Sequence, residues 1–258
     1  MEGEALHSPA PLPRGAAPLA RRAAAELIGT ASLVAIVVGS GIQAAALSAD
    51  IGVQLLANSL ASAIGLGLLI VLFGPLSGGY LNPVVTLAAW WAGRHDGSGP
   101  SAGDAAAYVT AQAAGAVGGA LLAEAMFGRA TIAWSTQARI GDRLLLGEVV
   151  ATAGLVLLIY GLTRIGRPQL TPVAVAAYIG AAIWFTSSGS FANPAATVGR
   201  AFTDSFTGIS PASLPGFVGA QLAGGLLGIG LATLLFGSPP HRTTLPDERG
   251  AQGVQGAH

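Results

Sequence analysis

The sequence predicts an all-α membrane protein with six transmembrane helices and two re-entrant half-helices, arranged as two inverted repeats of three spans each. Hydrophobic residues make up 52% of the 258 residues, and Asp, Glu, Lys and Arg only 9%. A soluble domain typically carries about 25% charged residues. Six apolar segments have roughly the length that crossing a bilayer requires. Two short Asn-Pro boxes lie in corresponding places of the two halves.

The composition excludes several classes of function. All 12 basic residues are arginines and the formal net charge is zero, so the chain offers no strongly basic surface to a nucleic acid. There is no cysteine, which rules out disulfides and thiolate metal sites. The apolar segments hold no nucleophile–base pair and no His/Asp cluster, so we expect no enzyme activity, no metal site and no cofactor. The expected partner is the lipid bilayer.

Taken in order, the chain divides into five parts. Residues 1–21 are rich in Pro, Ala and Gly and are expected to form a disordered N-terminal tail. The first repeat follows at 22–127, an outer connecting loop at 128–142, the second repeat at 143–236 and a C-terminal tail at 237–258. The six expected spans are 23–47, 52–73, 104–127, 144–164, 171–188 and 213–236.

The two boxes predict half-helices at 82–92 and 193–204. Each box follows a Gly/Ser-rich, loop-like stretch and continues as a short apolar run. Proline is tolerated at the first position of a helix, where the N–H that it lacks has no partner anyway. Asparagine is among the best residues just before that position, because its side chain caps the free amides. The boxes are Asn82-Pro83-Val84 and Asn193-Pro194-Ala195.

Arginine placement predicts the orientation, because positive residues concentrate in cytoplasmic loops. In a six-span topology, only three arginines fall in the loops on one side of the membrane, and most of the others fall on the opposite side. We therefore expect both termini in the cytoplasm and the protein in the plasma or inner membrane. The three arginines expected outside are Arg129, Arg139 and Arg143, and those expected inside include Arg14, Arg21, Arg22, Arg94, Arg164, Arg167, Arg242 and Arg249.

The two halves repeat the same markers. The residues around Glu26 in the first span match those around Glu148 in the fourth, and Gln112 matches Gln221. Because each half holds three spans, an odd number, the second half must enter the bilayer upside down. Inverted repeats with interrupted hydrophobic segments indicate a solute path near the midplane.

With its two boxes and the paired glutamates, the chain resembles the major intrinsic protein family, the aquaporins and aquaglyceroporins, between about 22 and 236. The resemblance implies a homotetramer with one pore in each subunit. Loop carbonyls would line the path, and Asn82 and Asn193 would donate hydrogen bonds at its centre. Each half-helix N-terminus carries roughly half a positive charge, so two facing the same point repel cations and protons. The implied function is a passive channel for water and small neutral solutes.

Two departures from the family pattern bear on the solute. Val84 stands where the family has alanine, and we expect its bulk to narrow the centre or to shift the helix ends apart. The family usually has arginine directly after the second box, where this chain has Ala196. Arg200 lies four residues on, on the same helix face. Three interpretations stay open: it reaches back into the filter, it guards the vestibule, or it pairs with Asp204.

Counting back from each box carries over three more positions of the outer selectivity filter: Ser62, Ala181 and Ser190. Water-selective members resemble one another in having an aromatic residue and a histidine at the first two. Both are small here, which predicts a wide outer constriction. We therefore expect neutral solutes of glycerol size or larger, with urea and undissociated metalloid acids as alternatives.

Glu26 and Glu148 are the remaining intramembrane candidates. The resemblance implies that each accepts hydrogen bonds from the re-entrant loop of its own half. The alternative is a carboxylate near the headgroups, with Glu26 close enough to Arg22 to pair. A charged group near the bilayer centre is costly and is a functional candidate. An ion-coupled secondary transporter, which also has inverted repeats, is the alternative function, and these two glutamates would be its coupling groups.

Overall fold

The computed structural model describes residues 17–94, 97–129 and 132–237, and all regular secondary structure in them is helical. Six helices are long and apolar enough to cross a membrane, when the fifth is counted with the short 3-10 turn Pro168–Leu170 before it. This confirms the predicted fold class. Most of each expected tail, 1–16 and 238–258, lies outside the described residues. The six helices are α1 (Leu19–Leu47), α2 (Ile51–Ser77), α4 (Ala102–Met126), α5 (Asp142–Arg164), α6 (Thr171–Phe185) and α8 (Leu214–Phe236).

Three ends of the six spans differ from the expected ranges by three residues or more, and the half-helix α7 ends at Gly199 instead of residue 204. Helix α1 begins at Leu19, inside the stretch assigned to the tail. Helix α2 continues past residue 73 through Pro75 and ends where Gly78 adopts a left-handed φ of 102°, a conformation that glycine adopts without strain. Helix α6 ends at Phe185, three residues early, because Thr186 is already extended.

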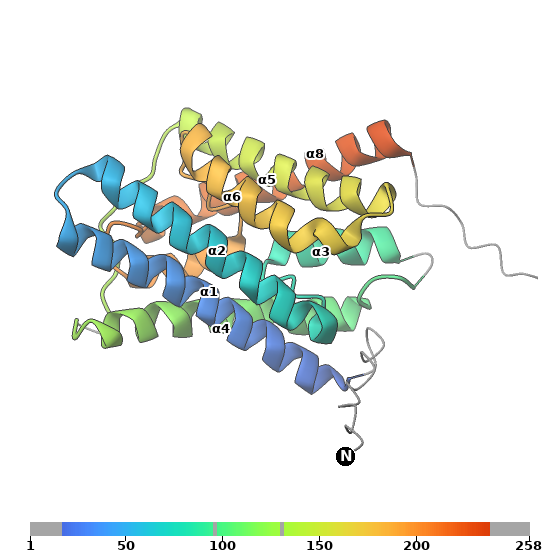
Figure 1. Ribbon diagram of the computed structural model, residues 1–258, viewed down its shortest axis with the longest axis horizontal. Helices are drawn as coiled ribbons and strands as arrows, with labels where there is room; N and C mark the ends of the chain where they lie inside the picture. Colours follow the sequence, from blue (N-terminus) through green and yellow to red (C-terminus); the bar gives the residue numbers. More distant parts are fainter. Residues whose placement is uncertain (1–16, 95–96, 130–131, 238–258) are drawn as a thin grey trace, which may run out of the picture.

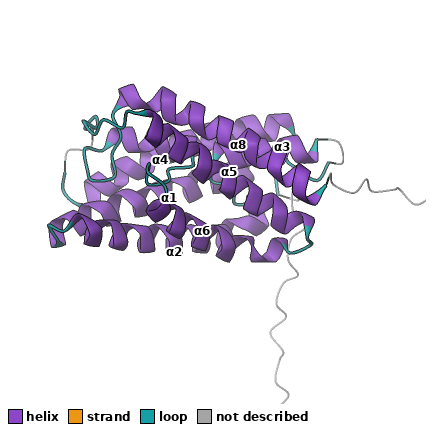
Figure 2. Cartoon of the chain, turned by 90° about the horizontal axis from the view of Figure 1, so that it is seen from above, coloured by secondary structure: helices purple, strands orange, loops and turns teal. Residues whose placement is uncertain are grey.

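The helices run side by side along the long axis of the molecule (Figures 1 and 2). Helix α1 packs on α4 and α2, and α5 packs on α8 and α6. The start of α1 and the end of α8 lie at the same end of the bundle (Figure 1). A chain with an even number of spans ends on the same side of the bundle as it begins.

Glycines bring the helices of each half close together. A Cβ added to Gly115 or Gly119 of α4 would collide with the backbone of α1, and one added to Gly224 or Gly228 of α8 would collide with the backbone of α5. Small residues at such positions are typical of packed membrane helices. The contact is repeated in both halves, as an inverted repeat requires.

The two half-helices are α3 (Pro83–Gly93) and α7 (Pro194–Gly199), and each begins at the proline of a box. A 3-10 turn, Arg200–Phe202, continues α7. Each half-helix contacts α4 and α8, and the two half-helices also contact each other in the middle of the bundle. From there α3 extends toward the end at which the chain termini lie (Figure 1).

Candidate pore

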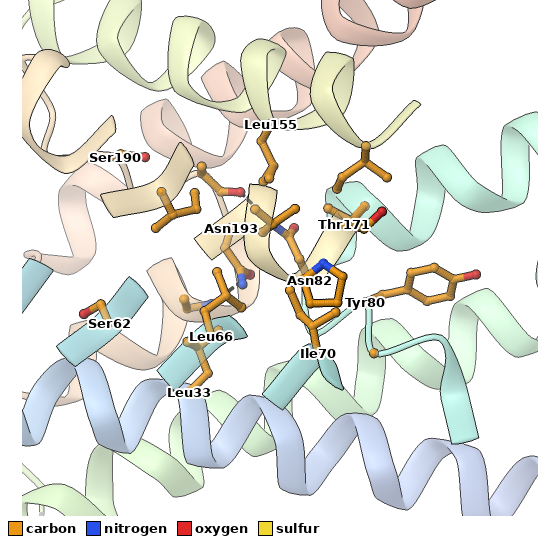
Figure 3. A pocket seen from close by; sticks show the side chains of 18 of the residues that line it. Leu33, Ser62, Leu66, Ile70, Tyr80, Asn82, Leu155, Thr171, Ser190 and Asn193 are labelled. Carbon is orange, nitrogen blue, oxygen red and sulfur yellow. Dashed lines mark hydrogen bonds between the residues drawn. The ribbon is translucent and has the colours of Figure 1, made fainter. Parts of the chain in front are cut away.

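The two Asn-Pro boxes meet in the centre of the bundle. The Nδ2 of Asn82 donates to the carbonyl of Ala192 at 2.7 Å, and the Nδ2 of Asn193 donates to the carbonyl of Leu81 at 2.8 Å. Each Oδ1 caps its own half-helix by accepting the N–H two residues on, at 2.9 Å from Val84 and 3.0 Å from Ala195. The half-helices therefore face each other N-terminus to N-terminus, joined by a reciprocal pair of hydrogen bonds (Figure 3).

The loops before the boxes hold strained backbone. Leu81 has a φ of 51° and Ala192 a φ of 47°, in the left-handed region that residues with a Cβ rarely adopt. Such conformations cost of order 1–3 kcal/mol each and persist only where the surroundings enforce them. In this conformation the carbonyl of Leu81 accepts the hydrogen bond from Asn193, and the carbonyl of Ala192 accepts the one from Asn82.

Glu26 holds the first loop in this conformation. Its fully buried carboxylate accepts the backbone N–H groups of Tyr80 at 3.0 Å and Leu81 at 2.7 Å, and the hydroxyl of Ser77 at 2.6 Å. The alternative pairing with Arg22 does not form, because that guanidinium binds Asp104 at 2.9 Å. Several hydrogen-bond donors around a buried carboxylate offset the cost of removing it from water.

Glu148 holds the second loop in the same way. It is also fully buried and accepts the N–H groups of Phe191 at 2.8 Å and Ala192 at 2.9 Å. In both halves a glutamine links the glutamate to the half-helix. Gln112 donates to Glu26 and Thr86, and Gln221 donates to Glu148 and Thr197, each at 2.6–2.9 Å.

A cavity of about 1200 Å³ passes the asparagine pair and reaches both ends of the bundle. We call the end lined by Arg139 and Arg200 the arginine mouth, and the end lined by Tyr80 and Tyr108 the tyrosine mouth. Ser62 and Ser190 lie on one side of Asn82 and Asn193 and Tyr80 on the other (Figure 3). Leucine, isoleucine and valine side chains of the spans form an apolar wall that includes Leu55, Leu66, Ile70, Leu155, Ile159 and Ile179.

Four of the five expected filter residues line the cavity toward the arginine mouth: Ser62, Ser190, Ala196 and Arg200. The hydroxyls of Ser62 and Ser190 are buried and have no hydrogen-bond partner within the part of the chain that the structure describes. Both residues line the cavity, but their hydroxyl oxygens are covered by protein in this conformation, so a hydrogen bond to a permeating group requires the serine side chain to rotate. Ser190 itself has a φ of 49°, which turns the loop at this point.

The fifth-span position needs correction. Ala181 is exposed on the outside of the bundle and does not line the cavity, whereas Ile179 and Ile183 of the same helix do. A two-residue step turns an α-helix by about 200°, to the opposite face. The apolar side chain of Ile183 therefore stands where counting along the sequence had put a small residue.

Val84 also differs from its expected role. It is buried but does not line the cavity. Its side chain points at helix α8, where a Cβ added to Gly225 would come within 2.5 Å of its Cγ1. Ala195, the matching residue of the second box, clusters instead with Ala116, which matches Gly225 in the repeat. The extra bulk of Val84 thus occupies the space that the missing side chain of Gly225 leaves on α8, and it does not enter the cavity.

Arg200 lies at the arginine mouth. Its guanidinium carbon is 3.3 Å from the centroid of the Phe191 ring, and its Nε donates to the carbonyl of Thr207 at 2.5 Å. The expected alternative of a pair with Asp204 is wrong, because that carboxylate accepts from the N–H and hydroxyl of Thr136, both at 2.9 Å. Arg200 faces the cavity, as the vestibule and filter interpretations require.

Arg139 lines the same mouth and was missed as a site residue, since the sequence placed it only in a connecting loop. Its Nε donates to the carbonyl of Gly208 at 2.9 Å, and its guanidinium carbon is 4.9 Å from the Phe191 centroid. Burial lowers the pKa of Arg139, and the carboxylate of Glu148 acts in the opposite direction. The guanidinium group of arginine stays protonated in proteins, so Arg139 carries a positive charge.

Comparisons with known proteins agree with this architecture. The model of the family "Major intrinsic protein" matches residues 16–187. The aquaglyceroporin AqpS of Rhizobium meliloti (strain 1021) is 45% identical over 231 residues, which cover 89% of this chain and 97% of that protein. The probable aquaporin TIP1-2 of Oryza sativa subsp. japonica is 31% identical over 238 residues, 86% of this chain and 89% of that one.

The fold is that of a solved membrane channel. The X-ray structure of the aquaglyceroporin from Plasmodium falciparum superposes with a TM-score of 0.63 at 20% identity, covering 85% of this chain and 96% of that one. The chain belongs to the major intrinsic protein family. Members of this family are membrane channels and not enzymes, and this chain is accordingly a multi-pass membrane protein.

Proposed function

We propose that the chain is a passive channel for water and for neutral solutes of glycerol size or larger, and that this channel excludes ions and protons. The observation that carries the proposal is the meeting of two half-helix N-termini beside a cavity that reaches both ends of the bundle. Neutral molecules can replace their solvent hydrogen bonds with the asparagine amides and loop carbonyls. Cations meet the positive ends of two helices at once.

The solute size rests on the walls toward the arginine mouth. Ser62, Ser190 and Ala196 are small and line the cavity, while Ile183 gives one apolar face. An amphipathic solute that carries hydroxyls along one edge fits a path with asparagine amides and loop carbonyls opposite an apolar wall. Both termini in the cytoplasm and a homotetrameric assembly complete the proposal, the first from the arginine distribution and the second from the family.

The test is stopped-flow light scattering on proteoliposomes with water, glycerol and urea. We expect protein-dependent flux of all three solutes. Ala196→Arg places a long side chain beside the path and should reduce glycerol flux several-fold more than water flux. Ala196→Gly, which adds no bulk, is the control and should leave glycerol flux undiminished. Unaltered glycerol flux in Ala196→Arg would show that the filter lies elsewhere.

A further inference from the structure

Two arginines from separate elements converge on one aromatic ring at the arginine mouth. Arg139 comes from the loop between α4 and α5, and Arg200 from the turn after α7. Their guanidinium carbons lie 4.9 and 3.3 Å from the centroid of Phe191, and both side chains line the cavity. Both groups therefore lie beside the path through this end of the cavity.

This pair of charges is not neutralised. Among the described residues the salt bridges join Arg22 to Asp104 and Arg129 to Glu124, and neither Arg139 nor Arg200 has an acidic partner within 4.0 Å. Burial lowers the pKa of both arginines, and the carboxylate of Glu148 acts in the opposite direction. Both guanidinium groups nevertheless stay protonated, as arginine does in proteins. The oxygens of Glu148 are already engaged by the second loop and Gln221. Two guanidinium groups against one carboxylate leave a net positive charge beside the path.

Arg139 is held in place by the backbone. Its N–H donates to the hydroxyl of Ser213 at 3.0 Å, and its guanidinium donates to the carbonyls of Gly208 at 2.9 Å and Phe206 at 3.5 Å. None of these acceptors carries a charge, so they fix the guanidinium without cancelling it. A fixed charge in a cleft with low-dielectric walls acts more strongly than the same charge in water.

We infer that Arg139 is a specificity-determining residue, which together with Arg200 supplies the positive charge that Ala196 does not provide and so keeps cations out of a wide mouth. The inference rests on the proposed channel function. It assigns cation rejection to the mouth as well as to the half-helix ends. A wide mouth needs this charge more than a narrow one, because a small cation is not excluded there by size.

The test compares urea with guanidinium, which has nearly the same planar shape but carries a positive charge. Permeability to each is measured in proteoliposomes containing the full chain, and the readout is the guanidinium-to-urea ratio. In R139Q, which removes the charge and keeps hydrogen-bond donors, we expect the ratio to rise about tenfold. In R139K, which keeps the charge but loses the planar donor geometry, it should stay within about twofold of the unmodified chain.

The matched control is R143Q, since Arg143 is an exposed arginine near the same end of α5 and does not line the cavity. Its ratio should not change. An unchanged ratio in R139Q would overturn the inference, because the charge would then have no effect on cations. An equal rise in R139K would also overturn it, because the residue would then act only by holding the loop. Absence of urea flux in the unmodified chain would instead refute the proposed channel.

Salt supplies a second measurement that needs no variant. Fixed charges are screened over about 3 Å at 1 M salt and about 30 Å at 0.01 M. The guanidinium-to-urea ratio of the unmodified chain should therefore rise several-fold between these concentrations. A ratio independent of salt would overturn the inference even if R139Q failed to fold.

Discussion

The two halves of the bundle hold their boxes with the same set of side chains but differ in the volume packed behind them. Glu26 and Gln112 in one half, and Glu148 and Gln221 in the other, bind the loop and the half-helix through matching hydrogen bonds. Behind the boxes the first half places Val84 against Gly225, and the second half places Ala195 in a cluster with Ala116. The hydrogen bonds are the same in both halves, but the larger side chain lies on the half-helix in the first half, and two alanines fill the equivalent space in the second.

The box residue acts on the packing behind the half-helix. Valine at position 84 does not line the cavity, because Gly225 of the neighbouring helix α8 has no side chain and leaves room for it. The effect of the box residue is therefore on packing between half-helix and span. The chemistry of the path depends on the loop carbonyls, the asparagines and the residues near the mouths.

The largest expected effect comes from breaking the shared polar support. Glu148→Gln and Glu26→Gln each place an amide NH₂ group among buried donors, and should lower the free energy of unfolding by about 3–5 kcal/mol and remove most solute flux. Thermal unfolding of detergent-purified protein and stopped-flow flux measure the two effects. Asp142→Asn, at the exposed start of α5, is the control. If one half tolerated the change, the two supports would not be equivalent.

The next effect tests the corrected face of α6. Ile183→Trp puts a large ring into the cavity and should reduce glycerol flux at least several-fold, whereas Ala181→Trp, on the exposed face, should leave it nearly unchanged. Both variants are read out by glycerol-driven light scattering at equal protein content. The reverse result would restore the position obtained by counting along the sequence.

A smaller effect tests the volume exchange between the halves. Gly225→Ala overpacks Val84 and should cost about 1–3 kcal/mol of unfolding free energy. Val84→Ala in the same chain should recover at least about 1 kcal/mol of it, which a double-mutant cycle measures. Gly230→Ala, at a glycine of α8 with open space around it, is the control. Strict additivity of the two changes would mean that the residues do not share this space.

The smallest effect concerns a helix start that is capped in one half and not in the other. Ser101 caps α4 in a capping box with Asp104, whereas α8 begins without a side-chain cap bond. Ser101→Ala should cost about 1 kcal/mol, and Ser101→Thr, which keeps the capping oxygen, should cost much less. Thermal unfolding measures both. Equal losses in the two variants would show that the cap contributes nothing.

The sequence predicted the elements and the centre of the site because both depend on local chemistry and on repetition. Apolar length predicts spans, Asn-Pro predicts a capped helix start, and the paired glutamates mark the loops that they hold. Asn82 and Asn193 do lie together, and both glutamates do accept hydrogen bonds from their own loops.

What the sequence could not predict depends on rotation and on loops. Whether Ala181 or Ile183 faces the cavity depends on where α6 ends and how the loop to Asn193 turns, and a two-residue error reverses the face. The direction of Val84 follows from the packing of α3 on α8, where Gly225 stands in the place that Ala116 takes in the other half. Arg139 reaches the mouth from a loop of irregular structure, for which sequence periodicity gives no signal.

The most direct test of the account is glycerol flux into proteoliposomes, measured against glycerol concentration, temperature and an imposed proton gradient. For a passive channel we expect protein-dependent flux that follows the glycerol gradient, does not saturate, has a low activation energy and does not depend on the proton gradient. We also expect no proton leak through the protein. Saturable flux that is driven by the proton gradient would contradict the channel and support an ion-coupled transporter.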